Sequence, residues 1–255
     1  MATKYVVDGD QRLRFDKKIT ELMRQVHAQE TLAYDPEDLI DHLQIATEGK
    51  FNLIHPLATE MKIFTKWRSK WPEFWRLLDV DVIDIMSRPN FPKFIRPGFP
   101  WVIVDPGLMD DAVLAEELFK KIGIPYGVSI ALLDYTNSAT PGTAVAILVR
   151  DTIEPDSEYV GKSANDADGI TEKEGKRFIF RRHWVILFAF LWWMTKGKQK
   201  LDVSGWTRFP KNRLSDGSVA YGRWDPFNDW VELRCDDGDD RREGAGPREG
   251  NFFTL

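Results

Sequence analysis

Apolar residues recur at intervals of three and four through the first third of the chain, which is the spacing of amphipathic helices. The pattern predicts four helices, over 15–29, between 35 and 49, over 56–70 and over 72–85. Asp35 fits the N-cap of the second helix, Pro36 fits its first position, and Gly49 is a natural stop. Residues 1–88 are therefore predicted to form a helical N-terminal region.

Prolines interrupt this rhythm over residues 88–100, where four of them exclude regular structure. An amphipathic stripe then predicts a helix over 108–122, closed by Gly123. Continuous apolar runs predict three strands, over 101–104, 128–133 and 144–149. This order of strand, helix and two strands favours an α+β arrangement over repeated βαβ units. Residues 89–150 are predicted to be a mixed α/β segment.

The longest apolar run, residues 184–194, predicts a buried central strand. It is about half the ~20 residues of a membrane-spanning helix, so insertion at a membrane interface is the minor alternative. Residues 151–176 are polar and rich in Gly and Asp, which predicts a long surface loop. Shorter apolar runs predict strands of an antiparallel meander, over 178–180, 201–206, 219–222 and 230–233. Residues 151–235 are therefore predicted to be a mainly antiparallel, Trp-rich β region.

The last twenty residues differ in character from the β region before them. Residues 236–250 are charged and rich in Gly, so 236–255 is predicted to be an acidic, flexible tail. Its tip, residues 251–255, is apolar, with two Phe and a Leu. Three hypotheses stay open for this tip: folding back on its own domain as an edge strand, docking on a partner, or fraying.

Composition narrows the function classes. The net charge of −5 and the pI near 5.5 lack the basic footprint of nucleic-acid binding. The single cysteine, Cys235, cannot form an internal disulfide, and the chain starts without the basic and apolar runs of a signal peptide. We expect a soluble, cytoplasmic protein that binds neither nucleic acid nor a membrane.

Motifs for catalysis or metal binding are present only as fragments. Asp79 and Asp81 resemble the first motif of haloacid-dehalogenase-type phosphotransferases, but they follow a predicted helix rather than the strand that this nucleophile requires. Residues 161–163 (Gly-Lys-Ser) lack the first glycine of a P-loop, and the acids of 165–169 lack the glutamate that completes a calcium loop. No pair of histidines has the spacing of a helical zinc site: His27, His42, His55 and His183. The sequence predicts no catalytic residue, no metal ligand and no cofactor.

Aromatic and charged side chains alternate between positions 206 and 230. The aromatic members are Trp206, Tyr221, Trp224, Phe227 and Trp230. The polar members between them are Arg208, Arg223, Asp225, Asn228 and Asp229. Exposed Trp, Tyr and Arg are the residues that dominate binding energy at interfaces, so this set predicts a partner-binding surface. The alternative is that the rings simply form core.

Three stretches, 43–51, 107–123 and 224–231, resemble uncharacterised proteins of bacterial and metagenomic origin, a resemblance that implies no activity. The segment around Gly222 and Trp224 is similar to the C-type-lectin-like variable proteins of diversity-generating retroelements, which end in a Gly-x-Trp segment with scattered polar residues. This chain departs from the first group, because its tail continues well past Trp230. The second resemblance implies a C-type-lectin-like fold and a bacterial or phage source.

Two functional hypotheses follow. The first is a non-catalytic binding or structural protein that uses the aromatic and Arg/Asp-rich surface to hold a protein or a small ligand. The second is a hydrolase whose carboxylates come from separate strands. Acids with raised pKa that converge in a pocket favour the enzyme, and an aromatic surface without them favours binding. The oligomeric state stays open.

Overall fold

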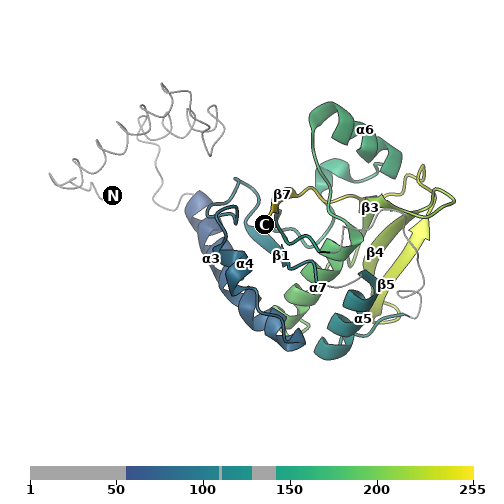
Figure 1. Cartoon of the computed structure of the whole chain (residues 1–255). Helices are drawn as coiled ribbons and strands as arrows, with labels where there is room; N and C mark the ends of the chain where they lie inside the picture. The colour runs from purple at the N-terminus through teal and green to yellow at the C-terminus, as the bar shows by residue number, and fades with distance from the viewer. Residues whose placement is uncertain (1–55, 109–110, 128–141) are drawn as a thin grey trace, which may run out of the picture. The chain divides into compact units, whose positions relative to one another are not determined.

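The structure, a computed structural model, describes residues 56–108, 111–127 and 142–255. They form an α+β unit, as predicted, in which two β-sheets pack against one helix, α7 (Figure 1). The helices are α3 (Pro56–Trp75), η1 (Arg76–Leu78), α4 (Ile83–Ser87), α5 (Asp111–Ile122), η3 (Ser157–Tyr159), α6 (Ala164–Glu174) and α7 (Arg181–Thr195). The strands are β1 (Trp101–Asp105), β2 (Val145–Val149), β3 (Trp206–Arg213), β4 (Val219–Asp225), β5 (Trp230–Asp236), β6 (Ala245–Gly246) and β7 (Asn251–Thr254).

The two sheets draw their strands from distant parts of the chain. One has the order β1-β2-β7 and is antiparallel throughout. The other has the order β5-β4-β3-β6, in which the pair β3–β6 is parallel. The strands predicted over 101–104, 144–149, 219–222 and 230–233 are confirmed. The strand predicted over 201–206 starts later, at Trp206, and continues to Arg213.

The prediction of a central strand over 184–194 is wrong, because these residues lie in the helix α7. Every side chain from Arg181 to Leu191 is buried, so the helix is covered on all sides. A helix buried all round needs no polar face, and its sequence then lacks the three-and-four rhythm that separates helix from strand. The described residues contain no helix whose length and apolar character would let it cross a membrane.

Aromatic rings join α7 to its neighbours on two sides. Towards α3, Phe190 stacks on Trp71 with ring centroids 3.8 Å apart. Towards the second sheet, Phe188 stacks on Trp224 of β4. Gly222 lets β4 approach α7 closely at Trp184, because a Cβ at position 222 would lie 3.1 Å from the Trp184 ring. The predicted separate segments thus contribute to one core.

A single helix, α3, replaces the two helices predicted over 56–70 and from 72 onward. It runs through Pro72, and only short helices, η1 and α4, follow it. The indole Nε1 atoms of Trp71 and Trp75 donate hydrogen bonds to the carbonyls of Val102 and Val104, each at 2.9 Å. These two bonds hold α3 against β1 on both sides of the proline, so tertiary packing overrides the local stop signal.

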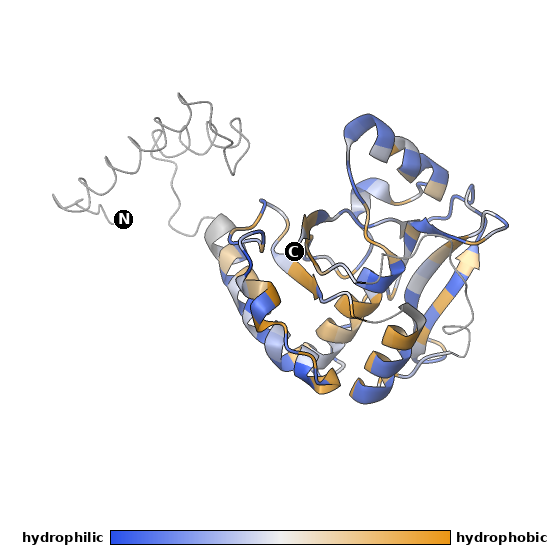
Figure 2. Cartoon of the chain, in the orientation of Figure 1, coloured by the Kyte–Doolittle hydropathy of each residue, from blue (hydrophilic) through white to orange (hydrophobic). Residues whose placement is uncertain are grey.

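The helix α5 matches its prediction closely, since it spans Asp111–Ile122 and ends at Gly123 with a φ of +75°. Orange and blue bands along α5 in Figure 2 mark its amphipathic sequence, and Leu114, Leu118 and Phe119 are buried. Several other predictions fall outside the described residues: the helices of 15–29 and 35–49, the strand of 128–133, and His27, His42 and His55.

The long surface loop predicted over 151–176 is wrong, because it contains η3 and α6. Ser163 is the N-cap of α6: its Oγ accepts from the Asp166 backbone N–H at 3.1 Å, and Asp166 accepts in turn from the Ser163 N–H at 2.9 Å. This reciprocal capping box was readable in the sequence as Ser-x-x-Asp. With α6 and α7 inside it, the region 151–235 is not a purely antiparallel β region.

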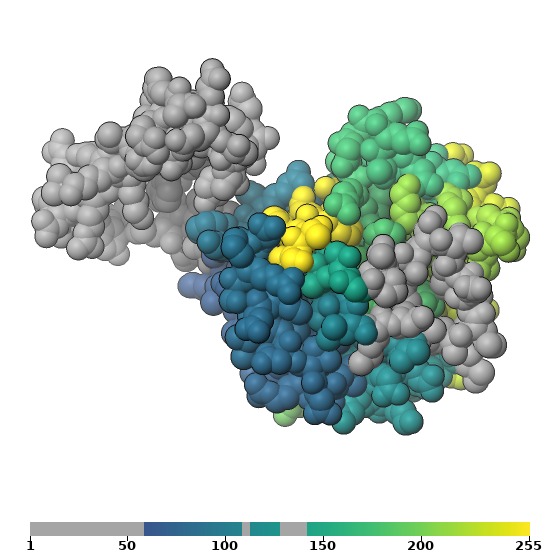
Figure 3. Space-filling view, viewed as in Figure 1, coloured from purple at the N-terminus to yellow at the C-terminus, as the bar shows by residue number. Residues whose placement is uncertain are grey.

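The flexible tail predicted over 236–255 is also wrong. Strand β6 pairs with β3, and the side chains of Arg248 and Glu249 are buried. The last residues fold back as predicted in the first of the three hypotheses: β7 is an edge strand antiparallel to β2, with Phe252 opposite Ile147. Figure 3 shows these C-terminal residues, in yellow, set into the surface between earlier segments of the chain.

Candidate functional site

The predicted binding residues lie on the β3–β4–β5 sheet and on the hairpin that joins β4 to β5. Side chains alternate between the two faces of a strand, and Gly222 and Trp224 face α7. The strand register therefore places six predicted residues on the opposite, outer face: Trp206, Arg208, Tyr221, Arg223, Asp225 and Trp230. Trp224 is buried against α7, so for this ring the alternative hypothesis, core, is correct. Arg208, Tyr221 and Asp225 are also buried, although they lie on the opposite face.

A stack of rings and guanidinium groups is the main feature of the outer face. Trp206 stacks on Tyr221 with centroids 5.4 Å apart and an angle of 20° between the ring planes. The guanidinium carbons of Arg223 and Arg242 each lie 5.1 Å from the Trp206 ring centroid. Cations over an indole are attracted by its π-electrons, so the stack is stable before any partner arrives.

Acidic residues neutralise the arginines of this outer face. Glu232 binds Arg223 at 2.6 Å and Arg234 at 2.5 Å, one through each carboxylate oxygen. Arg208 donates to the backbone carbonyl of Asp240. Burial lowers the pKa of Arg208, and the nearby carboxylate of Asp240 partly offsets this shift. Because the charges are paired within the chain, this face is not a bare charged patch.

The tip of the β4–β5 hairpin, residues 226–229, is both ordered and exposed. Asp225 Oδ1 accepts a hydrogen bond from the Phe227 N–H at 2.9 Å, and its Oδ2 accepts from Asn228 Nδ2 at 2.7 Å. The bond from Asn228 holds the pKa of Asp225 below its usual value. Asp229 adopts a φ of +54° and binds Lys200 at 3.2 Å. The turn that these contacts fix leaves the Phe227 residue 94% exposed.

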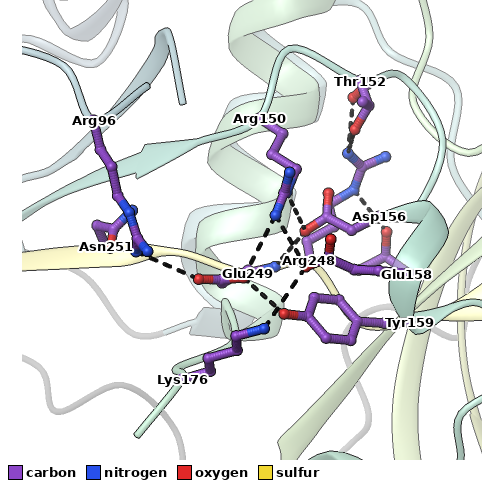
Figure 4. Close-up of polar contacts among 11 residues, drawn as sticks. Arg96, Arg150, Thr152, Asp156, Glu158, Tyr159, Lys176, Arg248, Glu249 and Asn251 are labelled. Carbon is purple, nitrogen blue, oxygen red and sulfur yellow. Dashed lines mark hydrogen bonds and ion pairs between the residues drawn. The ribbon is translucent and has the colours of Figure 1, made fainter. Parts of the chain in front are cut away.

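A buried polar cluster around Glu249 was missed by sequence reasoning (Figure 4). Arg150 lies between two carboxylates, 3.6 Å from Asp156 and 3.7 Å from Glu249. The Tyr159 hydroxyl donates to Glu249 at 2.7 Å, and Arg96 lies 3.6 Å from the same carboxylate. Burial raises the pKa of Asp156, and burial together with the Glu249 bond raises the pKa of Tyr159.

This cluster is the place where the hydrolase hypothesis can be examined, since two acids converge there and one has a raised pKa. However, Asp156 Oδ2 accepts from the backbone N–H of Glu249 at 2.7 Å, and both residues are at least 95% buried. A hydrolytic carboxylate must reach a substrate or a water. Here both acids are engaged in holding the segment after β6 against the body of the protein.

A second buried set, centred on Asp202, fixes the same segment from the other side. Asp202 accepts from Trp184 Nε1, from Thr207 Oγ1 and from Arg248 Nη2, each at 2.6 Å. Arg248 also donates to the backbone carbonyl of Thr152 at 2.8 Å. Burial raises the pKa of Asp202, and Arg248 opposes this shift. These contacts join α7, β3 and the segment after β6, so they stabilise the fold.

His183 lies in the first turn of α7 rather than at the end of a strand. Its Nδ1 accepts from the Phe180 N–H at 3.3 Å, and its Nε2 lies 3.6 Å from Asp105, which Arg182 binds at 2.5 and 2.9 Å. Burial lowers the pKa of His183 to about 4, and Asp105 only partly opposes this. The imidazole is therefore neutral at pH 7 and packs against the Phe252 ring.

No metal centre can be assembled from the described residues, where no three His, Cys, Asp or Glu side chains come together as ligands. The residues of the incomplete motifs have other positions and contacts in the fold. Asp79 and Asp81 are exposed beside η1. The acids of 165–169 lie on α6, where Asp166 binds Arg241 and Asp168 binds Arg213.

Comparison of the chain with family models, with curated proteins and with solved structures finds no match in any of the three. The function must therefore be argued from the geometry of the chain itself.

Proposed function

We propose that the chain is a non-catalytic binding protein that docks on another protein through the tip of its β4–β5 hairpin. The observation that carries this proposal is the nearly complete exposure of Phe227 on a turn that Asp225 holds in place. Single exposed apolar residues are common on protein surfaces, so exposure alone is weak support. An exposed ring on an ordered protruding turn is stronger support, because little conformational entropy is lost when it binds.

The chemistry of the tip defines the partner that it fits. Phe227 would enter an apolar pocket, and burying its ring would contribute about 1.5–3 kcal/mol. Asn228 and Asp229 follow it in the sequence, are both exposed, and would meet hydrogen-bond donors or cations at the rim of that pocket. Trp230 is half-buried at the base of the hairpin, opposite Asp225.

The hydrolase alternative has weaker support. Its best pair of acids, Asp156 and Glu249, is buried and occupied by Arg150, by Tyr159 and by a backbone N–H. The outer-face acids Asp225 and Glu232 are likewise bound to neighbouring groups. Pairing of this kind stabilises a fold, whereas general acid–base catalysis needs a carboxyl group that can reach a substrate.

We further propose a cytoplasmic location for this binding role. Cys235 is the single cysteine of the chain and lies half-buried on β5. A chain with one cysteine can form no internal disulfide, so its fold does not depend on an oxidising compartment.

Affinity capture with matched variants tests the docking proposal. The wild-type chain, Phe227→Ala and Ile83→Ala would each be immobilised and exposed to an extract of the source cells. Ile83 on α4 is 52% exposed and far from the hairpin in sequence, so it serves as the control for losing an exposed apolar side chain. We expect the wild type and Ile83→Ala to capture the same partner in equal amounts. Phe227→Ala should capture about tenfold less of it, or even less than that. Equal capture by all three would contradict the proposal.

A further inference from the structure

A second site lies far along the chain from the hairpin tip. Between α3, β1 and the C-terminal end of α7, the described residues enclose an open cavity of about 530 Å³. Cavities that hold small molecules commonly measure roughly 300–1,000 Å³ and combine apolar walls with a few polar groups. This cavity has both the size and the composition of such a site.

Tryptophans supply its apolar wall. Trp67 of α3 and Trp101 of β1 stack with ring centroids 4.3 Å apart and an angle of 15° between the planes. Trp193 of α7 is half-buried on the other side and contacts Phe74 and Phe190 beneath it. These packed contacts fix the indoles in place, so the wall is formed before any ligand binds.

Lysines dominate the polar lining. Lys66 and Lys70 lie on α3, and Lys196 follows the end of α7. The one acid of the lining, Glu73, binds Lys70 at 2.7 Å. Among the described residues, Lys66 and Lys196 have no acidic partner, so three positive charges against one negative charge leave a net charge of +2. An anion entering the cavity would be attracted by both unpaired ammonium groups.

We propose that this cavity binds a small aromatic anion, with its ring against the tryptophans and its carboxylate, sulfonate or phosphate between Lys66 and Lys196. A flat ring is favoured over an aliphatic tail, because three indoles line the site and aromatic pairs gain energy beyond the area that they bury. The proposal goes beyond docking by the hairpin, since the two sites share no residue.

Calorimetric titration with a matched pair of probes tests the proposal. Naphthalene sulfonate carries the anionic group, and naphthalene sulfonamide has nearly the same shape without the charge. Decanoate supplies an anion with an aliphatic tail. The proteins would be the wild type, the double variant Lys66→Gln Lys196→Gln, and the control Lys120→Gln Lys121→Gln, which removes two exposed lysines from α5. All three must show the same melting temperature.

We expect the wild type and the control to bind the sulfonate alike, and the sulfonamide at least about fivefold more weakly. The double variant should lose about 4- to 25-fold in affinity for the sulfonate, which is about two- to fivefold for each exposed charge. Rising salt should weaken sulfonate binding to the wild type, since exposed charges are screened. Equal affinity for sulfonate and sulfonamide, unchanged binding by the double variant, tighter binding of decanoate, or no binding at millimolar sulfonate would each overturn the proposal.

Discussion

Two stretches that both carry charged residues and phenylalanine, 245–255 and 226–229, differ in burial in this fold. Residues 245–255 contain β6 and β7, and the hairpin tip, residues 226–229, follows β4. The C-terminal segment is held down by buried ion pairs, with Arg248 only 2% exposed. The hairpin tip is equally ordered, yet its Phe227 is almost entirely exposed. Burial here depends on distant partners, not on local composition.

The partners of the C-terminal segment lie far away in the sequence. Arg248 binds Asp202, and Glu249 binds Tyr159 and approaches Arg150. By contrast, Phe227 and Asn228 of the hairpin tip are held by their own neighbour, Asp225, and Asp229 is the member of the tip with a distant partner, Lys200. The comparison teaches that order has two sources in this chain, and that at the hairpin tip locally derived order leaves a surface available for binding.

Breaking the buried ion pair should have the largest effect on stability. Arg248→Met leaves the carboxylate of Asp202 buried without its cation, so we expect a loss of about 3–5 kcal/mol in the free energy of unfolding. Arg234→Met, which removes an ion pair whose arginine side chain is 59% exposed, should cost less than about 1 kcal/mol. Chemical denaturation of both variants measures the difference, and equal losses would show that burial of the pair is irrelevant.

Acid should loosen the C-terminal segment through His183, which packs against Phe252. The pKa of His183 is about 4 in the folded chain, against 6.5 for an ordinary histidine, because burial disfavours the charged ring. Between these values the unfolded chain binds more protons than the folded chain, so stability falls as pH falls from 6.5 to 4. The linkage amounts to about 3 kcal/mol at most.

His183→Asn removes this titration while its side-chain oxygen can still accept from the Phe180 N–H. We expect the variant to lose less stability than the wild type when unfolding is measured at pH 7 and again at pH 4. Asp105, Arg182 and Arg177 surround the imidazole and remain in both proteins, so the difference isolates His183. Parallel pH profiles for the two proteins would refute the assignment.

Removing the last five residues tests how much strand β7 adds to the stability of the fold, apart from the buried ion pairs. The deletion removes four residues paired with β2 and the half-buried Phe252 and Phe253, so we expect a loss of about 2–3 kcal/mol. The exposed side chain of Thr254 provides a control, and Thr254→Ala should change stability by less than about 0.5 kcal/mol. An unchanged melting temperature after the deletion would mean that the pairing of β7 adds nothing.

The smallest expected effects come from replacing one phenylalanine in the C-terminal segment and one in the hairpin tip and comparing the two losses of stability. Phe252 lies under the guanidinium of Arg177, 4.1 Å from its ring centroid, and is half-buried. We expect Phe252→Ala to cost about 1–2 kcal/mol and Phe227→Ala less than about 0.5 kcal/mol. Thermal unfolding of the two variants checks this. A large loss for Phe227→Ala would show that its ring packs within the fold and is not held out for a partner.

The parts of the fold that local pattern governs could be predicted from the sequence. The strands β1 and β2 and the helix α5 follow from apolar runs and stripes, and the capped turn Ser163–Asp166 was readable although overlooked. The helix α7 could not be predicted, because burial on all sides removes the rhythm that would mark it. Nor could the C-terminal segment, since nothing local marks a pair such as Asp202 and Arg248.

The candidate site likewise has features that follow from local sequence and features that depend on distant segments. Alternation along β4 would have separated Trp224 from Tyr221 and Arg223, once the strand was recognised. The turn at Asp225 is equally local, since its hydrogen bonds to Phe227 and Asn228 join residues at most three apart, but the sequence pattern alone did not place Phe227 at its tip. The cavity beside Trp67 and Trp193 could not be foreseen, because its walls come from α3, β1 and α7, which only the folded chain brings together.

Photo-crosslinking from position 227 tests the central claim, docking through the hairpin tip, most directly. The chain would carry the photoreactive amino acid benzoylphenylalanine in place of Phe227 or, as the control, in place of Ile83, and would be irradiated in its source cells. Both positions are exposed, so non-specific collisions should label them alike. The account predicts a discrete adduct with one protein from position 227 and none of that size from position 83. No adduct at 227, or the same adducts from both positions, would contradict it.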